Sequence, residues 1–411
     1  MVKLLGSTTE HLTPPAKQAL DKQNRQTKAF YPMMIVPGIV LLLAPSTVET
    51  IMEQFGFRES MGGLLQITYF AGGVAGALLI THLMQRFTVK EIAISQVLVL
   101  SVSLLATSLA PWYPLLLLFF VVAGFANGIL ITFPGVYVTG VCGESSHHQQ
   151  SLLYGFFALG VVTGPLLSGL LINNGHSWRW AFAIPALMII PLSIPVALAS
   201  FERLDGVKKL SRSVLREILE FNRLLFLGLL IAILLYIAAE SATSMWLITF
   251  LREEHGISLA TAHWTLTALW VAITVGRWIC GYLSRKVDPY TLLIVLCAVS
   301  GVLLIVTPLT GSSASVMFLY PAVGLFFSGI YPFLIGYVSW FPSELSSSVF
   351  TMFLAAGAAG GAVLPYFVGL VNQFFGLVWG MCSIAMPVFG VLACIYWSRH
   401  HVTGGITEGA V

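Results

Sequence analysis

Long runs of apolar residues, separated by short polar segments, dominate the chain. A helix that crosses a bilayer needs about 20 mostly apolar residues. Runs of this length begin near Phe30, Ser60, Ile92, Trp112, Gln150, Trp178, Leu224, Thr261, Tyr290, Ser315, Leu345 and Leu377. The strands of a membrane β-barrel are short and alternate apolar with polar residues, so these continuous runs exclude a barrel. The pattern predicts an all-α polytopic membrane protein with twelve transmembrane helices.

Polar segments divide this predicted bundle into two halves. We assign a cytoplasmic tail, a six-helix bundle, a cytoplasmic linker, a second six-helix bundle and a second cytoplasmic tail to residues 1–29, 30–201, 202–222, 223–398 and 399–411. The first apolar run is long and lacks a small-residue cleavage site, so it is interpreted as a retained span rather than a signal peptide. Apolar residues at helical spacing from Ser213 to Leu219 predict a short amphipathic helix on the inner membrane surface.

The composition supports a lipid-facing surface. Hydrophobic residues make up 57% of the chain and charged residues 9%, and the mean hydropathy is +0.89. A soluble domain usually has about a quarter of its residues charged. The net charge of +3 and the scattered basic residues argue against a nucleic-acid partner. The five cysteines lie in or beside apolar runs without the spacing of a metal site or a disulfide framework, so we expect buried free thiols.

Lysine and arginine lie mainly on one side of the predicted bundle. With the amino terminus inside, sixteen of the 20 fall in inner segments, including six from Arg203 to Arg223. The outer side holds Arg58, Arg179 and Arg252, and Arg277 lies within a span. Cytoplasmic loops carry an excess of Lys and Arg, so both termini are predicted to be cytoplasmic. The short loops favour the inner membrane of a bacterium as the location.

The two halves resemble one another at an offset of 200 positions. The coincidences pair Gly56 with Gly256, Leu83 with Leu283, Gly124 with Gly324, Glu144 with Glu344, Pro165 with Pro365, and Gly169 with Gly369. They fall at the same points in the order of predicted helices, which indicates an internal duplication. Paired halves are typical of alternating-access transporters, in which two similar bundles rock around one site near the midplane.

Two stretches resemble the major facilitator superfamily. Gly160-Val161-Val162-Thr163-Gly164-Pro165 resembles the glycine–proline motif of the fifth helix, and Trp178-Arg179-Trp180-Ala181-Phe182 resembles the start of the sixth. Tyr236-Ile237-Ala238-Ala239-Glu240, with Trp246 to Leu251, is similar to the seventh helix of the fucose-permease-like sugar transporters. The resemblance implies the major facilitator fold, with two pseudo-symmetric six-helix bundles, and secondary transport.

The loops after helices two and eight depart from the family pattern Gly-x-Leu-x-Asp-Arg. Gln85 and Arg285 stand where the resemblance leads us to expect aspartate, beside the basic residues Arg86 and Lys286. The usual inner-gate ion pairing is therefore in doubt, although the basic side chains could bind carbonyl groups at helix ends. Predicted gating or structural residues are Gln85, Arg86, Arg277, Arg285, Lys286, Gly164 and Pro165.

Two charged residues lie deep in predicted spans, where charge is costly and often functional. Glu240 lies about 21 Å from the inner edge of helix seven, and Arg277 lies about 12 Å deep on helix eight. A difference of about 9 Å excludes a direct ion pair between straight helices. A carboxyl group removed from water favours its protonated form, so Glu240 is the candidate for proton coupling, with a hydrogen-bonded structural carboxyl as the alternative. For Arg277 we expect a contact with helix ends or Glu344.

Polar and aromatic residues near the predicted midplane are candidates for substrate binding. On helix seven, Tyr236, Glu240, Thr243 and Ser244 form one polar stripe at helical spacing. The substrate-binding candidates are Gln66, Tyr69, Asn127, Tyr154, Tyr236, Thr243, Ser244, Trp270, Thr274 and Tyr331. Interhelix hydrogen bonding is the alternative for each of them singly. Glu49 and Glu53, at the outer end of helix one, are interpreted as a solvated rim rather than a site.

These features favour a secondary active transporter that moves a small organic solute, with a sugar-like molecule as the candidate, by proton-coupled alternating access. A drug or metabolite efflux antiporter is one alternative, because the helix-five motif recurs among antiporters, although Ser168 replaces one glycine of its closing pair. A membrane sensor that does not transport is another. The chain has no Walker loop and no His/Asp/Cys cluster for hydrolysis, so we expect no enzyme. The expected partners are substrate, protons and lipid, with no cofactor or metal, and the expected state is a monomer.

The charge distribution makes a testable prediction about orientation. Single cysteines introduced next to Arg58 or Glu253 should react with a membrane-impermeant thiol reagent added outside intact cells. A cysteine next to Lys208 should react only after the cells are permeabilised. The opposite labelling pattern would refute the orientation derived from the Lys and Arg distribution.

Overall fold

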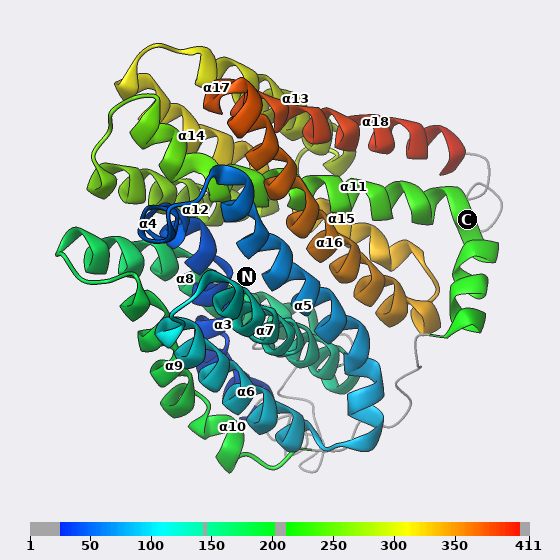
Figure 1. Cartoon of the computed structure of the whole chain (residues 1–411). Coiled ribbons are helices and arrows are strands. Elements are labelled where there is room, and N and C mark those ends of the chain that lie inside the picture. The colour runs from blue at the N-terminus through cyan, green and yellow to red at the C-terminus, as the bar shows by residue number, and fades with distance from the viewer. Residues whose placement is uncertain (1–24, 143–145, 202–210, 403–411) are drawn as a thin grey trace.

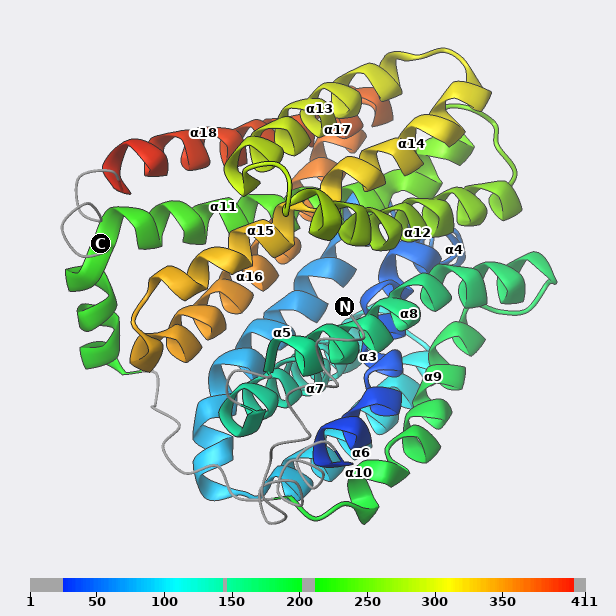
Figure 2. The same ribbon diagram turned by 180° about the vertical axis from the view of Figure 1, so that it is seen from behind.

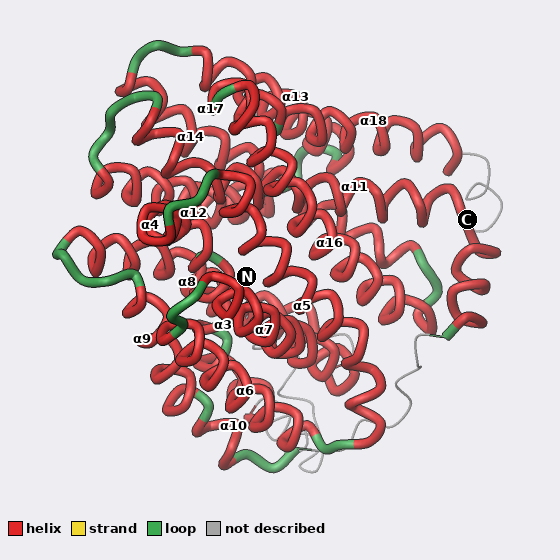
Figure 3. Tube along the Cα trace, viewed as in Figure 1, coloured by secondary structure: helices red, strands yellow, loops and turns green. Residues whose placement is uncertain are grey.

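The computed structural model describes residues 25–142, 146–201 and 211–402. In these ranges helices are joined by short loops (Figure 3). Twelve helical spans in the described part are long and apolar enough to cross a membrane, which confirms the predicted all-α architecture. The tail residues 1–24 and 403–411 and the linker residues 202–210 lie outside the described residues.

The first half consists of six spans. The first span, Arg25–Phe55, contains α3 (Ile35–Leu41) and α4 (Leu43–Phe55). The others are formed by α5 (Glu59–Arg86), α6 (Val89–Leu109), α7 (Tyr113–Cys142), α8 (Ser146–Asn173), and α9 (Arg179–Leu192) with α10 (Ile194–Leu198).

The second half repeats this order. It consists of α11 (Arg212–Glu253), α12 (Leu259–Leu283), α13 (Pro289–Leu309), α14 (Ser313–Phe327) with α15 (Ile330–Gly336) and the 3₁₀-helix η2 (Tyr337–Trp340), α16 (Ser343–Phe375), and α17 (Leu377–Ser383) with α18 (Ala385–Val402).

Prolines account for four interruptions within spans. Proline has no N–H to donate, and its ring clashes with the carbonyl group four residues earlier. Helices break just before Pro45, Pro195, Pro332 and Pro387, which separates α3 from α4, α9 from α10, α14 from α15, and α17 from α18. The break before Pro332 ends α14 at Phe327 in the middle of a span, and this position becomes important for the site.

The internal duplication is visible in helix packing. A Cβ atom at Gly160 would lie 1.9 Å from the Ile35 carbonyl oxygen, and one at Gly360 would lie 2.0 Å from that of Leu234. In the same way, Gly124 packs on Tyr69 and Gly324 on Leu269, at Cβ–oxygen distances of 1.9 and 2.4 Å. Membrane helices approach closely through small residues, so both halves use the same glycine contacts about 200 positions apart.

The first connection of each half also repeats. Gly56 and Gly256 follow α4 and α11 and have φ angles of 68° and 61°. This left-handed conformation is readily available only to glycine, so each residue allows the chain to reverse after a long helix. The matched turns and the matched close contacts together support one ancestral unit of six helices.

The two halves pack through three helix pairs, α5 with α16, α8 with α12, and α4 with α11. They lie closest where α4 and α11 end, and they spread toward the far ends of α10 and α18 (Figures 1 and 2). We call the first side the Arg252 end and the opposite side, where α5 ends, the Arg86 end. Near the Arg252 end, a Cβ at Gly369 on α16 would lie 3.0 Å from the Glu59 carbonyl oxygen on α5.

The linker leads into a helix that bends before it joins the bundle. Residues from Arg212 onward are helical, and Asn222 adopts φ −161° and ψ 90°, which breaks the helical path within α11. The Asn222 Oδ1 atom accepts a hydrogen bond of 3.0 Å from the Leu225 N–H, so the side chain caps the part of α11 that follows. The amphipathic segment therefore lies at an angle to the main part of α11 (Figure 1).

Candidate functional site

A cluster of ionisable side chains lies in the second half, where α14 gives way to α15. The Tyr236 hydroxyl lies 2.6 Å from Glu240 Oε1 and 3.0 Å from the Phe327 carbonyl oxygen. The Tyr331 ring stacks on that of Tyr236 with a centroid distance of 6.4 Å. Glu240 is only 8% exposed and lies 13 residues, or about 20 Å of helix, from the end of α11. The cluster is therefore buried near the middle of the bundle.

Arg277 joins this cluster from α12. The preceding residue, Gly276, packs so closely on α14 that a Cβ would lie 2.4 Å from Ser328 Oγ. The Arg277 charge consequently acts on Glu240, Tyr236 and Tyr331. Its Nε atom is buried and has no hydrogen-bond partner in the described part of the chain.

Arg277 and Glu240 act on one another through their charges, although they lie on different helices. The two side chains still form no ion pair among the described residues, as expected. The expected contact of Arg277 with a helix end or Glu344 is not among its contacts there.

The first half contributes uncharged polar groups. Asn127 Nδ2 lies 2.5 Å from the Tyr69 hydroxyl and 3.2 Å from the Pro37 carbonyl oxygen, which ties α7 to α5 and α3. Among the predicted binding residues of this half, three buried atoms have no hydrogen-bond partner in the described part of the chain, namely Asn127 Oδ1, Gln66 Oε1 and the Tyr154 hydroxyl. Buried polar groups are usually paired, so these atoms leave capacity for water or a bound solute.

A cavity of about 130 Å³ lies between the halves. Its lining includes Tyr69 and Phe70 on α5, Thr132 on α7, Ile237 on α11, Tyr331 on α15 and Phe353 on α16. A cavity of roughly 150 Å³ holds a molecule the size of benzene, so this space suits a small solute. Because Tyr331 belongs both to the lining and to the ionisable cluster, it connects the two.

The remaining predicted binding residues on α11 and α12 bond within the second half. The Thr243 and Thr274 hydroxyls donate to the carbonyl oxygens of Ala239 and Trp270, at 2.8 and 2.9 Å. Trp270 Nε1 donates to Ser244 Oγ at 3.2 Å and so links α12 to α11. The polar stripe predicted on helix seven thus divides into cluster residues and residues that hold the two helices together.

The predicted gating residues lie in two places. Gln85 is partly buried at the end of α5, and Arg86, Arg285 and Lys286 are exposed at the Arg86 end, where Lys286 Nζ lies 4.8 Å from the Tyr282 ring centroid. Gly164 packs on α3, since a Cβ there would lie 2.9 Å from the Ile39 carbonyl oxygen. Pro165 follows it at the contact of α8 with α12. A gating role for these residues stays a prediction.

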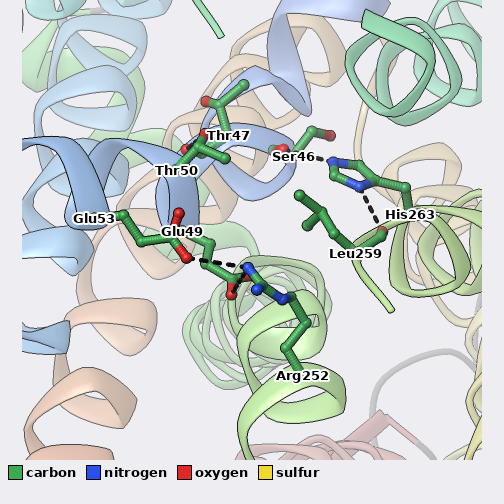
Figure 4. Close-up of polar contacts among 8 residues, drawn as sticks. All are labelled: Ser46, Thr47, Glu49, Thr50, Glu53, Arg252, Leu259 and His263. Carbon is green, nitrogen blue, oxygen red and sulfur yellow. Dashed lines mark hydrogen bonds and ion pairs between the residues drawn. The ribbon is translucent and has the colours of Figure 1, made fainter. Parts of the chain in front are cut away.

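The Arg252 end carries an ion pair between the halves, which the sequence reading missed (Figure 4). Arg252 Nη1, on α11, lies 2.5 Å from Glu49 Oε1 and 3.1 Å from Glu53 Oε1, both on α4. Glu49 is only 6% exposed, so it is not part of a solvated rim as expected, whereas Glu53 is exposed. The spacing of Glu49 and Glu53 at i, i+4 was the available signal, because it places both carboxylates on one helix face.

His263 makes a second contact between the halves at this end (Figure 4). Its Nε2 lies 2.9 Å from the Ser46 carbonyl oxygen on α4, and its Nδ1 lies 2.9 Å from the Leu259 carbonyl oxygen on α12. Both oxygens can only accept hydrogen bonds, and a neutral imidazole has a single N–H. A neutral ring can donate to one of these carbonyl groups, and protonation would supply the second N–H.

The motif at the start of α9 has a structural explanation. Arg179 Nη1 donates to the carbonyl oxygens of Ser108 and Ala110 at 2.6 and 2.9 Å, and so caps the end of α6. Trp178 Nε1 donates to Gln54 Oε1 at 2.6 Å and ties α9 to α4. Trp178 and Arg179 therefore hold α4, α6 and α9 together, and their hydrogen bonds are structural rather than ligand contacts.

Comparison with known proteins identifies relatives of the chain. A family model described as Major Facilitator Superfamily matches residues 33–339. The glucose/mannose transporter GlcP of Bacillus subtilis is 23% identical over 395 residues, or 89% of this chain and 91% of that protein. A TsgA homologue of Buchnera aphidicola is 22% identical over 62% of this chain and 64% of that protein.

Solved structures share the fold. A bacterial homologue of the human lysosomal transporter Spinster, in an inward-facing and unoccupied conformation, gives a TM-score of 0.79 at 16% identity and covers 93% of this chain and 98% of its own. The Escherichia coli fucose:proton symporter FucP gives a TM-score of 0.67 at 16% identity, covering 92% and 99%.

The ion pair at the Arg252 end generates a prediction about closure. Replacing Arg252 with Gln should weaken closure of this end by about 1–2 kcal/mol, between the values for exposed and buried ion pairs. Spin labels on the exposed residues Asn174 and Glu254, which belong to different halves, should then show a larger fraction of long distances. Arg58→Gln, an exposed change at the start of α5, should leave the distance distribution unchanged. An unchanged distribution in Arg252→Gln would show that the ion pair does not hold this end closed.

His263 generates a prediction about pH. Closure of the Arg252 end, measured with the same spin labels, should strengthen as the pH falls and His263 gains its second N–H. Protonation of Glu49 or Glu53 would weaken their ion pair with Arg252 and change closure in the opposite direction. His263→Phe should remove the strengthening at low pH, whereas His176→Gln, an exposed change at the same end, should retain it. A pH response that survives His263→Phe would assign it to another group.

Proposed function

The chain belongs to the major facilitator superfamily and is therefore a membrane transporter rather than an enzyme, and we propose that it moves a small hydroxylated organic solute, such as a sugar, by proton-coupled alternating access. The observation that carries the proposal is the position of Glu240. It is buried near the middle of the bundle, hydrogen-bonded to Tyr236, and connected through Tyr331 to the cavity between the halves.

Glu240 has the properties that a proton-coupling group needs. Tyr236 supplies a hydrogen bond to Glu240, and Arg277 is a nearby positive charge. Glu240 forms no ion pair among the described residues. Neither charge state is therefore fixed by a permanent partner, and a change in water access can shift the balance between them. In the proposed cycle Glu240 takes a proton on one side of the membrane and releases it on the other.

The interruption between α14 and α15 supports placing the solute here. In membrane transporters, substrate sites are often formed at discontinuous helices near the midplane, where backbone groups become available. The Phe327 carbonyl, at the end of α14, accepts from Tyr236 and so attaches the coupling residue to the break. Movement of α15 with the solute would then change the hydrogen bonds of Tyr236 and Glu240.

A hydroxylated solute suits the polar groups of the first half. The unpartnered acceptor atoms of Asn127 and Gln66 and the Tyr154 hydroxyl could bind the hydroxyl groups of a sugar. Two proteins that resemble this chain are named as a glucose/mannose transporter and a fucose:proton symporter. Sugars are accordingly the first solutes to test.

We propose that the structure represents an inward-facing state. If the Arg252 end is the outer side, as the Lys and Arg bias predicts, the contacts of Arg252 and His263 with α4 close the outer face. A solved inward-facing structure with the same fold gives a TM-score of 0.79, which supports this proposal. We further propose that the protein acts as a monomer in a bacterial inner membrane with both termini cytoplasmic.

An efflux antiporter is the second candidate. It is favoured by the glycine–proline segment of α8, where Gly160 and Gly164 pack directly on α3. A rigid contact between these helices would suit exchange, in which the protein changes between its inward-facing and outward-facing states only with a solute or ion bound. Accumulation of a solute inside vesicles with the pH gradient in one orientation or the other distinguishes symport from antiport.

The role of Glu240 can be tested with Glu240→Gln in proteoliposomes, using D-glucose, D-mannose and L-fucose as probes. The amide keeps the size of the side chain but fixes a neutral form, so accumulation driven by a pH gradient should be abolished. Binding and exchange without a gradient should remain. Glu217→Gln, at an exposed position on the same helix, should accumulate solute as the unmodified protein does.

Two other results would assign Glu240 a different role. If its charge contacts the solute, binding itself should weaken by roughly 1.5–3 kcal/mol, the range for hydrogen bonds to charged groups. If Glu240 is purely structural, the thermal midpoint should fall while pH-driven transport per folded molecule stays intact, and the coupling proposal would be abandoned.

A further inference from the structure

Arg277 is the least satisfied charge in the described interior. A charged side chain within a membrane bundle usually pairs with an acid or with backbone carbonyl groups. The Arg277 Nε atom is buried without a partner, and no described carboxylate forms an ion pair with this side chain. Glu240 interacts with Arg277 only through its charge and is hydrogen-bonded to Tyr236. No anion in the described part of the chain therefore binds Arg277 directly.

The position of Arg277 is suited to a ligand that enters the cavity. The guanidinium is partly exposed, while Gly276 locks its helix onto the interruption after Phe327. Tyr331, one of the residues on which the Arg277 charge acts, lines the cavity. A group bound at Arg277 would therefore reach the cavity past the Tyr331 ring.

A hydroxyl group of the other half lies near the same place. The Tyr154 hydroxyl, on α8, is buried without a partner and lies close enough to Tyr331 to interact with it electrostatically. A planar guanidinium binds a carboxylate through two parallel hydrogen bonds, and a phenol can donate one more. An anion held by Arg277 and Tyr154 would connect the two halves.

We propose that Arg277 binds a carboxylate group of the transported solute, with Tyr154 as a second donor, so that the substrate is a small organic acid, such as a sugar acid. This inference rests on the proposed function and narrows its substrate class. The mainly apolar walls of the cavity, which include Phe70, Ile237 and Phe353, would enclose the rest of the molecule.

The same geometry explains how proton and anion would travel together. While Glu240 is ionised, its negative charge balances Arg277 and opposes a second anion. When Glu240 takes a proton, the cluster gains one positive charge, and a carboxylate can occupy Arg277 at lower electrostatic cost. One proton and one monocarboxylate then enter together, so the loaded site has no more net charge than the empty one.

The experiment uses the full-length protein and three matched pairs of probes: D-gluconate with D-sorbitol, D-galacturonate with D-galactose, and L-lactate with 1,2-propanediol. Thermal midpoints are measured at pH 5.5 and 7.5, at equal ionic strength. At least one carboxylate should stabilise the protein more than its neutral counterpart, since a ligand that binds only the folded state raises its stability. The effect should be larger at pH 5.5.

Variants separate binding at Arg277 from general charge effects. Arg277→Gln should weaken carboxylate binding about tenfold or more, and Arg277→Lys should recover only part of it, because an ammonium cannot form the two parallel hydrogen bonds. Arg223→Gln, an exposed change on α11, should have no effect. Glu240→Gln should still bind the carboxylate, with the pH dependence lost.

The possible results also separate this inference from the proposed function. If no carboxylate stabilises the protein beyond its neutral counterpart, or if Arg277→Gln binds it unchanged, the inference is overturned. Accumulation of the neutral probes under a pH gradient, unaffected by Arg277→Gln, would overturn it while leaving proton-coupled transport intact. Conversely, carboxylate binding that depends on Arg277 without any pH-driven uptake would support the inference and contradict the proposed coupling.

Discussion

The structure depends on one constraint: in the interior of a membrane bundle, every polar group must find a partner within the protein or in a cavity. Pro332 ends α14 at Phe327 and makes a carbonyl group available in mid-span. The Tyr236 hydroxyl, which has one proton to donate, lies within hydrogen-bond distance of both this carbonyl oxygen and Glu240 Oε1. The close packing of Gly276 on Ser328 then places the neighbouring Arg277 beside this interruption. One backbone interruption thus gathers the ionisable residues of three helices.

At the Arg252 end, the contacts between the halves are mainly polar. Toward the Arg252 end, polar groups on α4 meet Arg252 and His263, and small residues such as Gly369 let helices approach closely. Ion pairs and single hydrogen bonds can break and form again at modest cost, whereas an interdigitated apolar interface cannot. A face that must open in each cycle is therefore better closed by such polar contacts, and these are also the contacts that respond to pH and salt.

The twelve helices, their halves and the glycine contacts could be predicted from sequence, because apolar runs and a 200-residue offset are properties of the chain itself. The burial of Glu240 was expected from its place deep in an apolar span, and the i, i+4 spacing placed it with Tyr236 on one polar stripe, where the two are hydrogen-bonded. The action of the Arg277 charge on this cluster could not be predicted, because depth counting does not include the packing of α12 on a proline-interrupted neighbour. The contact of Arg252 with Glu49 was missed for a similar reason: residues about 200 positions apart meet only once the halves are docked.

The duplication preserved the scaffold but not the chemistry. At the same 200-residue offset, Glu240 corresponds to Val40, Arg277 to Ala77 and Tyr236 to Val36. In the other direction, Gln66, Asn127 and Tyr154 correspond to Leu266, Phe327 and Leu354. Each half thus keeps polar groups where the other is apolar, and in the cluster the charged groups belong to the second half alone. A change of protonation at Glu240 would then alter the electrostatics of one half, while the other offers neutral hydrogen bonds whose strength does not depend on pH. Such asymmetry lets a symmetric scaffold move as two rigid bodies while its charge changes in only one of them.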